Sequence, residues 1–266
     1  MHFSLITPTP GAEREAAMQW AKNLYDDHQW LWRFLAAAPG TARDFLFRRR
    51  DGEGSMPGFY VVSARKPQSF SDAWQVQSRD YDPQLQEGQR LGFELRANPV
   101  KQLKVERSPE QLKEFMARRK NEGLSEKETK RRVYVDVVMH EKKRLLEAHG
   151  FRRWADWPDA DEAKPALYEL VQDRCSDWLE KRAEQAGFRV LTRKLHDDKH
   201  GVRKEKSVRV DGYTKHQAER KNVFLSTVDF TGELEITNTA AFRKTLQNGI
   251  GHAKGFGCGL LLVRRI

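Results

Sequence analysis

Tyr25 and His28 are residues whose types and spacing could do chemistry. They lie in a stretch from Glu13 to about Ala38 whose apolar residues, Leu24 and Leu31 among them, recur at helical spacing. Three residues apart on a helix, the two side chains share one face, with Cβ atoms about 5–6 Å apart. An imidazole exchanges a proton near neutral pH, and a phenol can position or donate one. The spacing also fits a half-buried histidine that ends the apolar stripe with Tyr25 packed beside it, so both interpretations stay open.

A glycine-rich stretch near the C-terminus is the second candidate for chemistry. It runs from Gly249 to Gly259 and also contains Lys254, between a short predicted helix at 239–246 and an apolar run with strand character at 260–263. Its glycines are Gly249, Gly251, Gly255, Gly257 and Gly259. Glycine permits positive φ and close backbone approach, so amides here can converge on a phosphate. The helix precedes the loop, which excludes a Walker loop or a dinucleotide fingerprint. A helix cap followed by a bulged strand is the alternative, but five glycines exceed what a cap needs.

The charge of the chain favours a polyanionic partner. It carries 48 Lys and Arg against 38 Asp and Glu in 266 residues, a formal net charge of +10. Basic clusters include 48–50, 118–120 and 130–132, each of which taken alone is most simply a solvated face. There is no zinc-finger or helix-turn-helix pattern, so RNA is favoured over readout of the DNA major groove. The lack of an aromatic stacking motif points to recognition of shape and backbone.

Metal, cofactor and membrane functions find little support in the sequence. Cys175 and Cys258 match no metal-ligand spacing and suit a reducing cytoplasm. His196 and His200 are four residues apart, but 197–201 has the composition of a turn. No signal region or membrane-length apolar run is present. We therefore predict a cytoplasmic protein with no metal, no cofactor and no membrane partner.

The first hundred residues predict one α+β domain. Strands are expected at 2–6, 45–47, 59–63 and 91–96, with a turn at 51–54. One long helix is expected at 13–38 and a short polar helix at 71–76. This βαββαβ order is ferredoxin-like, a four-stranded antiparallel sheet with helices on one face. We assign the domain to residues 1–100.

The rest of the chain predicts a second domain of the same kind. Residues 101–132 are charge-dense and predict a linker, and 133–266 are assigned to the second domain. Its predicted strands are 133–138, 188–191, 207–210, 223–230 with 232–236, and the terminal run; its predicted helices are 141–149, 167–187 and 239–246. The predicted fold is therefore α+β, with two tandem ferredoxin-like (RRM-like, βαββαβ) domains. No sequence repeat marks a duplication.

Several motifs together resemble the CasE family, the CRISPR-associated endoribonucleases of type I-E systems. The chain carries Tyr25-x-x-His28 followed by Leu31-Trp32, then Arg43-Asp44-Phe45-Leu46-Phe47, then Leu95-Arg96-Ala97-Asn98-Pro99 with Lys101, and finally Gly249-Ile250-Gly251-x-x-Lys254-x-Phe256-Gly257-Cys258-Gly259-Leu260-Leu261. These matches run in order from one end of the chain to the other. The segment 141–164 looks longer than is usual in the family.

The resemblance implies two ferredoxin-like domains and a metal-independent nuclease that cuts the CRISPR repeat transcript beside a hairpin. It implies that the enzyme stays with its product, among other subunits of the Cascade complex. Tyr25 and His28 would act in cleavage, and the loop 249–259 would lie at the RNA groove. Arg209 and Lys215 fall on a predicted β-hairpin where the family carries basic residues, and Arg131 is a further RNA-binding candidate from the basic clusters.

The expected reaction follows from the chemistry of RNA. A 2′-OH held in line with the scissile phosphorus can attack it, leaving a 2′,3′-cyclic phosphate and a 5′-OH. His28 would act as general base or general acid, which the sequence does not decide, and Tyr25 would orient the 2′-OH. Lys254 or a nearby arginine would offset charge on the phosphorane. A non-catalytic ferredoxin-like RNA-binding subunit and a basic DNA-binding protein remain the alternatives.

Overall fold

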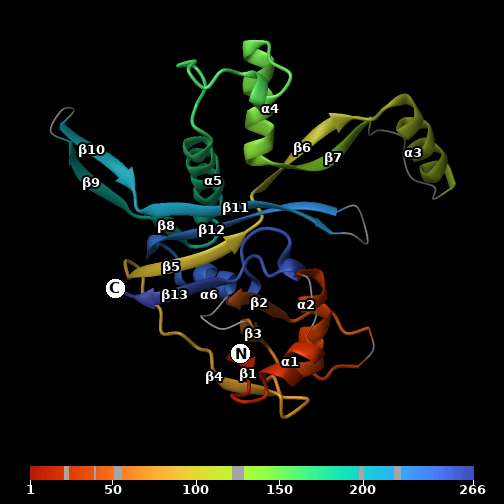
Figure 1. Ribbon diagram of the computed structural model, residues 1–266, viewed down its shortest axis with the longest axis vertical. Coiled ribbons are helices and arrows are strands. Elements are labelled where there is room, and N and C mark those ends of the chain that lie inside the picture. The colour runs from red at the N-terminus through yellow and green to blue at the C-terminus, as the bar shows by residue number, and fades with distance from the viewer. Residues whose placement is uncertain (21–23, 39, 51–55, 122–128, 198–200, 219–222) are drawn as a thin grey trace. The chain divides into compact units, whose positions relative to one another are not determined.

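The computed structural model describes residues 1–20, 24–38, 40–50, 56–121, 129–197, 201–218 and 223–266 (Figure 1). The chain forms two compact units, one of residues 1–99 with 165–266 and one of residues 100–164. The predicted domain limits at 100 and 133 differ from this division. No helix in the described part of the chain is long and apolar enough to cross a membrane.

The first unit begins with a four-stranded antiparallel sheet. Its strands are β1 (His2–Pro8), β2 (Phe45–Arg50), β3 (Gly58–Ser63) and β4 (Trp74–Asp80). They lie in the order β2-β3-β1-β4, which is the strand order of a ferredoxin-like sheet. Phe47, Phe59 and Val61 are fully buried on the face that also packs Trp30 and Phe34 from the helical segment between β1 and β2. This aromatic core fixes that helical segment against the sheet.

The helical segment is shorter and more broken than the sequence predicts. It consists of α1 (Glu13–Gln19), α2 (Leu24–Leu31) and the 3₁₀ turn η1 (Trp32–Phe34). Trp20 adopts an extended conformation and ends α1, and its indole N–H donates to the Asp27 carboxylate at 3.0 Å. One continuous helix over 13–38 is therefore wrong. The apolar residues of 13–38 recur at helical spacing, but the extended Trp20, hydrogen-bonded through its side chain to Asp27, ends the first helix.

Two further predictions about the first sheet are wrong. A helix at 71–76 is not found: residues 71–73 form a turn, and 74–76 begin strand β4, which pairs with β1 from Trp74 to Asp80. The strand at 91–96 exists but does not close this sheet. Alternating apolar residues predict a strand, but they do not say which sheet it joins.

The second sheet in the same unit repeats the strand order of the first. Its strands are β5 (Arg90–Ala97), β8 (Phe188–Val190), β11 (Val208–Ala218), β12 (Val223–Ile236) and β13 (Leu261–Arg265). They lie in the order β11-β12-β5-β13, with β8 paired to β12 (Figure 1). α5 (Leu167–Ala183) and α6 (Thr239–Asn248) cover one face, where Trp178 stacks on Phe230 and Phe242 packs on Phe188. The prediction of two ferredoxin-like domains is confirmed, with β5 as the first strand of the second one.

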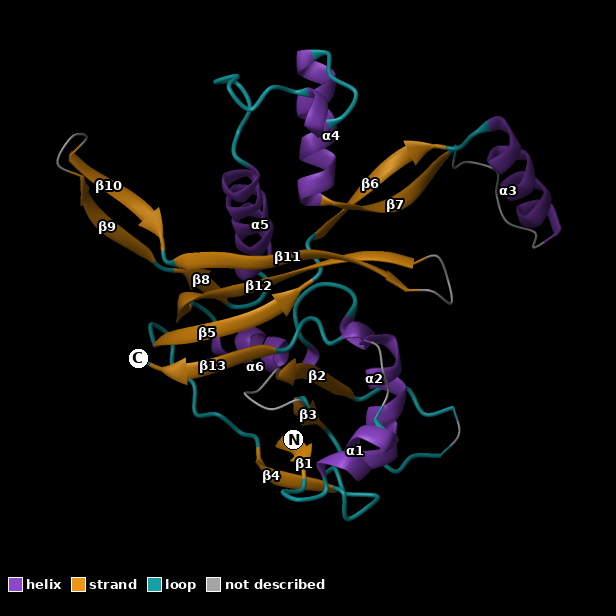
Figure 2. Cartoon of the chain, in the orientation of Figure 1, coloured by secondary structure: helices purple, strands orange, loops and turns teal. Residues whose placement is uncertain are grey.

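Two excursions interrupt the second ferredoxin-like domain (Figure 2). One is the hairpin of β9 (Thr192–Asp197) and β10 (Gly201–Lys206). The other is the second compact unit, which contains β6 (Val100–Glu106), α3 (Pro109–Asn121), β7 (Lys130–Asp136), α4 (Val137–His149) and the turn η2 (Trp154–Asp156). β6 and β7 pair with each other, so the predicted linker at 101–132 contains regular structure. The fully buried Trp157 lies against His149 and Phe151.

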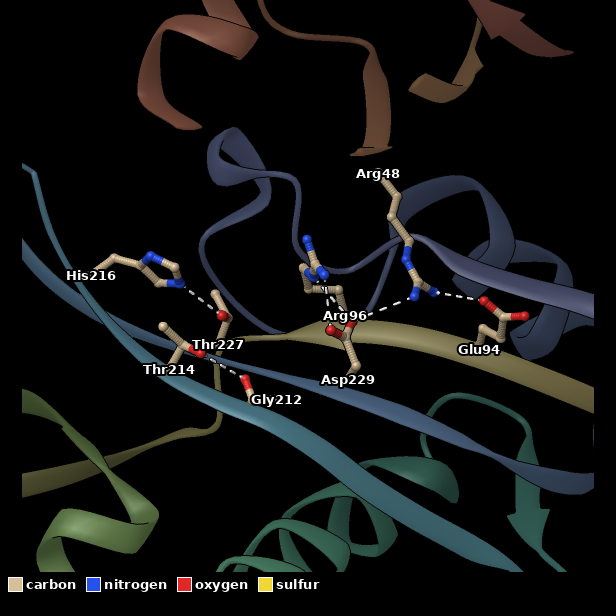
Figure 3. A network of polar contacts seen from close by, with 8 residues as sticks. All are labelled: Arg48, Glu94, Arg96, Gly212, Thr214, His216, Thr227 and Asp229. Carbon is tan, nitrogen blue, oxygen red and sulfur yellow. Dashed lines mark hydrogen bonds and ion pairs between the residues drawn. The ribbon is translucent and has the colours of Figure 1, made fainter. Parts of the chain in front are cut away.

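A polar network joins the two sheets of the first unit (Figure 3). Arg96 of β5 donates to both oxygens of the Asp229 carboxylate on β12, at 2.9 and 2.8 Å. Arg48 of β2 lies 3.4 Å from Asp229 and 3.4 Å from Glu94, and so bridges from the first sheet to the second. Beside the network, Leu46, Val62 and Leu260 form a small buried apolar cluster. These contacts hold β2 next to the loop that leads into β13.

Candidate active site

His28 projects from α2 onto the edge strand of the first sheet. Its ring stacks on Phe45 and Phe47, with ring centroids 5.6 and 6.5 Å apart, and meets the Trp32 ring edge-on at 6.3 Å. The Nε2 atom is buried and has no hydrogen-bond partner among the described residues. Tyr25 lies on the same helix, but its side chain is outside the described residues. The predicted Tyr25–His28 pair therefore stays a prediction.

The environment of His28 disfavours its charged form. Burial among aromatic rings lowers the pKa of the imidazole below its usual value, and the positive charge of Arg43 lowers it further. At pH 7 the ring is therefore mostly neutral. A neutral imidazole with a free nitrogen can accept a proton, and a nearby anion would raise its pKa and let it donate one.

The glycine-rich stretch forms a closed loop between α6 and β13, as its sequence predicts. The N–H of Ile250 donates to the Gly259 carbonyl at 2.9 Å and closes the base of the loop. The N–H of Gly259 donates to the Arg96 carbonyl and ties the loop to β5. Gly249 has φ 73° and ψ 170°, a region open essentially only to glycine. A Cβ there would lie 2.7 Å from the Gly259 carbonyl oxygen, so both conformation and space require glycine.

The tip of this loop lies beside α2 and β2. It contains the 3₁₀ turn η3 (Lys254–Phe256), which packs against α2. A Cβ on Gly257 would lie 3.2 Å from the Phe47 ring, and one on Gly255 would lie 3.4 Å from the Arg43 guanidinium. The loop therefore brings Lys254 and Arg43 to the region of His28, although these residues are more than 200 positions apart in the sequence.

Arg43 and Lys254 form a pair of half-buried cations. Burial lowers the pKa of both side chains, and the charge of Arg43 lowers that of Lys254 further. Neither side chain has an ion pair or hydrogen bond with any described residue. Like charges held together without a counter-ion are costly, and a bound anion would offset that cost.

Backbone donors add to these cations. The N–H groups of Gly251 and Gly255 donate to no acceptor in the described parts of the chain. Unpaired amides in a glycine-rich turn, together with two cations, match the donors that bind a phosphate. The site can therefore hold a phosphodiester within reach of a histidine that exchanges a proton.

The other predicted RNA-binding residues do not gather here. Arg209 and Lys215 both lie on β11, but a bulge between Asp211 and Thr214 shifts the register. Because side chains alternate along a strand, Arg209 faces the side of Thr231, and Lys215 faces the opposite side with Ser226. Arg209 forms an ion pair with Asp211. Arg131 lies on β7 in the second compact unit and is exposed. Contact of these three residues with RNA stays a prediction.

Two residues of the site were missed by sequence reasoning. Arg43 belongs to the quoted motif at 43–47, but no role was assigned to it. His252 lies in the loop between Gly251 and Ala253, and its imidazole has a pKa lowered by burial and by the charges of Arg182 and Lys254. The position of His252 inside the glycine-rich stretch is the sequence feature that could have identified it. Only the fold shows that Arg43 and Arg182 approach the loop.

Metal binding gains no candidate from the fold. No group of three or more His, Cys, Asp or Glu side chains in the described ranges is arranged to hold a metal ion. Of the pair considered in the sequence, His200 lies outside the described residues. Both cysteines are buried, and burial raises the pKa of Cys258 to about 12.

Comparison with known proteins gives one family for the whole chain. A family model described as "CRISPR associated protein" matches residues 1–265. The chain is 28% identical to the CRISPR system Cascade subunit CasE of Escherichia coli (strain K12) over 253 residues, covering 92% of this chain and 94% of the relative. It is 26% identical to the CRISPR-associated endoribonuclease Cse3 of Thermus thermophilus over 261 residues, covering 93% of each.

The fold has matches among solved structures. A structure of Thermus thermophilus Cse3 bound to an RNA representing a pre-cleavage complex is similar with a TM-score of 0.58 and 22% identity, covering 99% of this chain and 98% of the other. The similarity extends over the whole chain and shows a shared fold.

Proposed function

Since the chain belongs to the family of CRISPR-associated proteins, we propose that it is a metal-independent endoribonuclease that cuts CRISPR repeat hairpin precursor RNA into mature crRNA. One observation carries this proposal. Arg43 and Lys254 lie without a counter-ion among the described residues, beside a histidine whose pKa is lowered. Such a site accepts a phosphodiester and supplies a group that exchanges a proton. The names of the CasE and Cse3 relatives agree with this activity.

The geometry supports a reaction by internal transfer. The 2′-OH of the nucleotide before the cut loses its proton, and its oxygen forms a bond to phosphorus as the bond from phosphorus to the 5′-oxygen breaks. The 5′-oxygen takes up a proton, and a 2′,3′-cyclic phosphate and a 5′-OH result. Arg43, Lys254 and the loop amides would stabilise the charge that develops on the phosphorane. His28 would move one of the two protons, with Tyr25 orienting the 2′-OH.

The product is expected to stay bound. Many cations that place the hairpin also slow its release, because each neutralised phosphate adds to affinity. We propose that the protein remains on its crRNA as a subunit of a Cascade complex in the cytoplasm. The CasE relative is named as a Cascade subunit.

Binding and cleavage of matched nucleic acids test the proposal. Wild-type protein would be mixed with the repeat stem-loop RNA, with the same RNA carrying a disrupted stem, and with duplex DNA of the same sequence. We expect tight binding and a single cut only for the stem-loop RNA. Tight binding without a cut would favour a non-catalytic RNA-binding subunit, and preference for the duplex would favour a DNA-binding protein.

Arg43→Gln is expected to shift the pH dependence of cleavage. The charge of Arg43 lowers the pKa of His28, so its removal should raise that pKa, and the limb of the profile governed by His28 should move to higher pH. Single-turnover rates from about pH 4.5 to 8 at subsaturating protein measure this limb. A rate that rises with pH through the limb assigns the base role to His28, and a rate that falls assigns the acid role.

The matched control for this shift is Arg33→Gln. Arg33 follows α2 on η1 and is exposed, with its guanidinium 3.7 Å from the centre of the Phe70 ring. Arg33→Gln should leave the midpoint of the limb governed by His28 at its wild-type pH. An unchanged or lowered midpoint for Arg43→Gln would remove Arg43 from the environment of His28.

Lys254→Gln is expected to weaken binding of any repeat stem-loop and to reduce the salt dependence of binding. The slope of log K against log salt should fall in magnitude by about one, because one fewer phosphate is neutralised. Arg209→Gln and Lys215→Gln would be measured beside it. Since these two side chains face opposite sides of the sheet, we expect only one of them to lower the slope.

The control for the salt titration is Lys143→Gln. Lys143 already pairs with Glu147 one turn along α4, so its removal should leave the slope unchanged. Unchanged slopes for Lys254, Arg209 and Lys215 together would mean that the RNA lies on another surface, for which Arg131 and its basic neighbours are the candidates.

A further inference from the structure

The glycine-rich loop carries a second group of cations at its other end. Arg182 of α5 lies over the Trp178 indole, with the guanidinium carbon 4.1 Å from the ring centre, and also donates to the Trp178 carbonyl at 3.0 Å. The same indole stacks on Phe230, with ring centroids 6.0 Å apart. One edge of the indole reaches the loop, where a Cβ on Gly251 would lie 3.1 Å from the ring. The indole thus fixes Arg182 next to the residue that precedes His252.

His252 is exposed at this end of the loop. Partial burial lowers the pKa of its imidazole most, and the positive charges of Arg182 on α5 and Lys254 in its own loop lower it further. The residue between His252 and Lys254 is Ala253, whose φ of 57° is the only positive value among the described non-glycine residues. The left-handed region is sterically disfavoured for a residue with a Cβ. The loop holds this conformation at Ala253, which His252 and Lys254 flank in the sequence.

We propose that His252 and Arg182 form a second phosphate subsite, which binds a phosphodiester neighbouring the scissile one, and that His252 takes up a proton as this phosphate binds. The inference rests on the proposed function, because the scissile phosphate is placed between Arg43 and Lys254. Lys254 is then shared by two subsites, one at each end of the loop. Consecutive phosphates on one strand are several ångströms apart, so a strand that follows the loop presents one to each end.

The sign of the pH effect follows from the charges. Without RNA, partial burial and two neighbouring cations keep the pKa of His252 below its usual value, so the ring is mostly neutral at pH 7. A bound phosphate adds negative charge and raises that pKa. The affinity gained is fully present below the pKa of the free protein and is lost as pH rises through the pKa of the complex. Each unit by which RNA raises the pKa corresponds to about a tenfold change in affinity across that window.

The test uses the full-length protein in a His28→Ala background, which blocks cleavage and removes the titration of His28. Dissociation constants for the repeat stem-loop would be measured from about pH 5 to 8 for this parent, for His28→Ala with His252→Gln, and for His28→Ala with His149→Gln as a matched histidine control. We expect the parent and the His149 variant to bind more tightly at low pH. The His252 variant should show a flat profile.

RNA substrates with an uncharged backbone linkage identify which phosphate occupies the proposed His252–Arg182 subsite. A methylphosphonate would replace each phosphate on either side of the cut, one at a time. In the parent, one of these replacements should weaken binding; in the His252→Gln variant, and in a variant with Arg182→Gln, the same replacement should cost several-fold less. A pH profile unchanged by His252→Gln, or a methylphosphonate effect equal in all variants, would overturn the inference. Failure of the wild type to bind or cut the stem-loop would instead refute the proposed function.

Discussion

His28→Ala is expected to reduce single-turnover cleavage of the repeat stem-loop by about 10²–10⁴-fold, while the dissociation constant for that RNA changes only a few-fold. In the proposed reaction the ring of His28 exchanges a proton beside Arg43 and Lys254. Its buried Nε2 has no hydrogen-bond partner among the described residues. Removing the ring would take away that proton transfer but leave the cations and loop amides that are proposed to hold the phosphate. Rapid-quench cleavage at saturating protein and a filter-binding titration measure the two quantities.

The control is His149→Ala, a histidine that packs on Trp157 in the other compact unit. It should cleave at the wild-type rate. Tyr25→Phe should slow cleavage less than His28→Ala, because water can partly replace a hydroxyl that only orients the 2′-OH. Wild-type cleavage by His28→Ala would remove His28 from the mechanism.

The second large effect is expected for Gly249→Ala. A Cβ at this position would meet the Gly259 carbonyl oxygen at 2.7 Å and Leu46 at 3.0 Å, and φ is 73° with ψ 170°. Alanine at such a φ destabilises by more than about 1 kcal/mol, and the clash forces the base of the loop to move. A shift of about 1 Å at Lys254 can cost about 10²-fold in rate. We therefore expect a lowered unfolding temperature and cleavage reduced by about two orders of magnitude.

Gly88→Ala separates the backbone effect from the position of the loop. Gly88 also has a positive φ, 79°, but a Cβ there would meet nothing within 4 Å. This variant should lose some stability and retain its cleavage rate under conditions where it is folded. If Gly249→Ala cleaved as fast as Gly88→Ala at equal folded fraction, the position of the loop would not matter for catalysis.

The sequence predicts the fold because its local patterns agree with its tertiary structure in most places. Alternation identifies β1, β3 and β5, and the helix–glycine loop–strand order at the C-terminus is found as predicted. The wrong predictions for β4 and β5 share a cause. Tertiary contacts, and not the local sequence, decide which strand pairs with which. β4 is a polar edge strand anchored by the buried Trp74, and its composition suits a helix as well as a strand. β5 alternates as a strand must, yet it pairs with β12 and β13, which lie far along the chain.

Site residues that lie close together in the sequence could be predicted. Site residues that only the fold brings together could not. The loop glycines and Lys254 lie in one stretch, so their composition is visible in the sequence. Arg43 approaches Gly255 only because β2 and the loop meet across the two sheets. Arg209 and Lys215 are six residues apart, so simple alternation would place them on the same face of the strand. The bulge between Asp211 and Thr214 places them on opposite faces, and the sequence does not reveal it.

The most direct test of the account is cleavage of the repeat stem-loop in excess EDTA, with analysis of the product ends. A second substrate would carry a 2′-deoxynucleotide before the cut. The proposed metal-independent mechanism predicts an undiminished cleavage rate in EDTA and products with a 2′,3′-cyclic phosphate and a 5′-OH. It also predicts that the 2′-deoxy substrate binds normally but is not cut. Loss of cleavage in EDTA with recovery on adding Mg²⁺, or products with a 3′-OH and a 5′-phosphate, would contradict it.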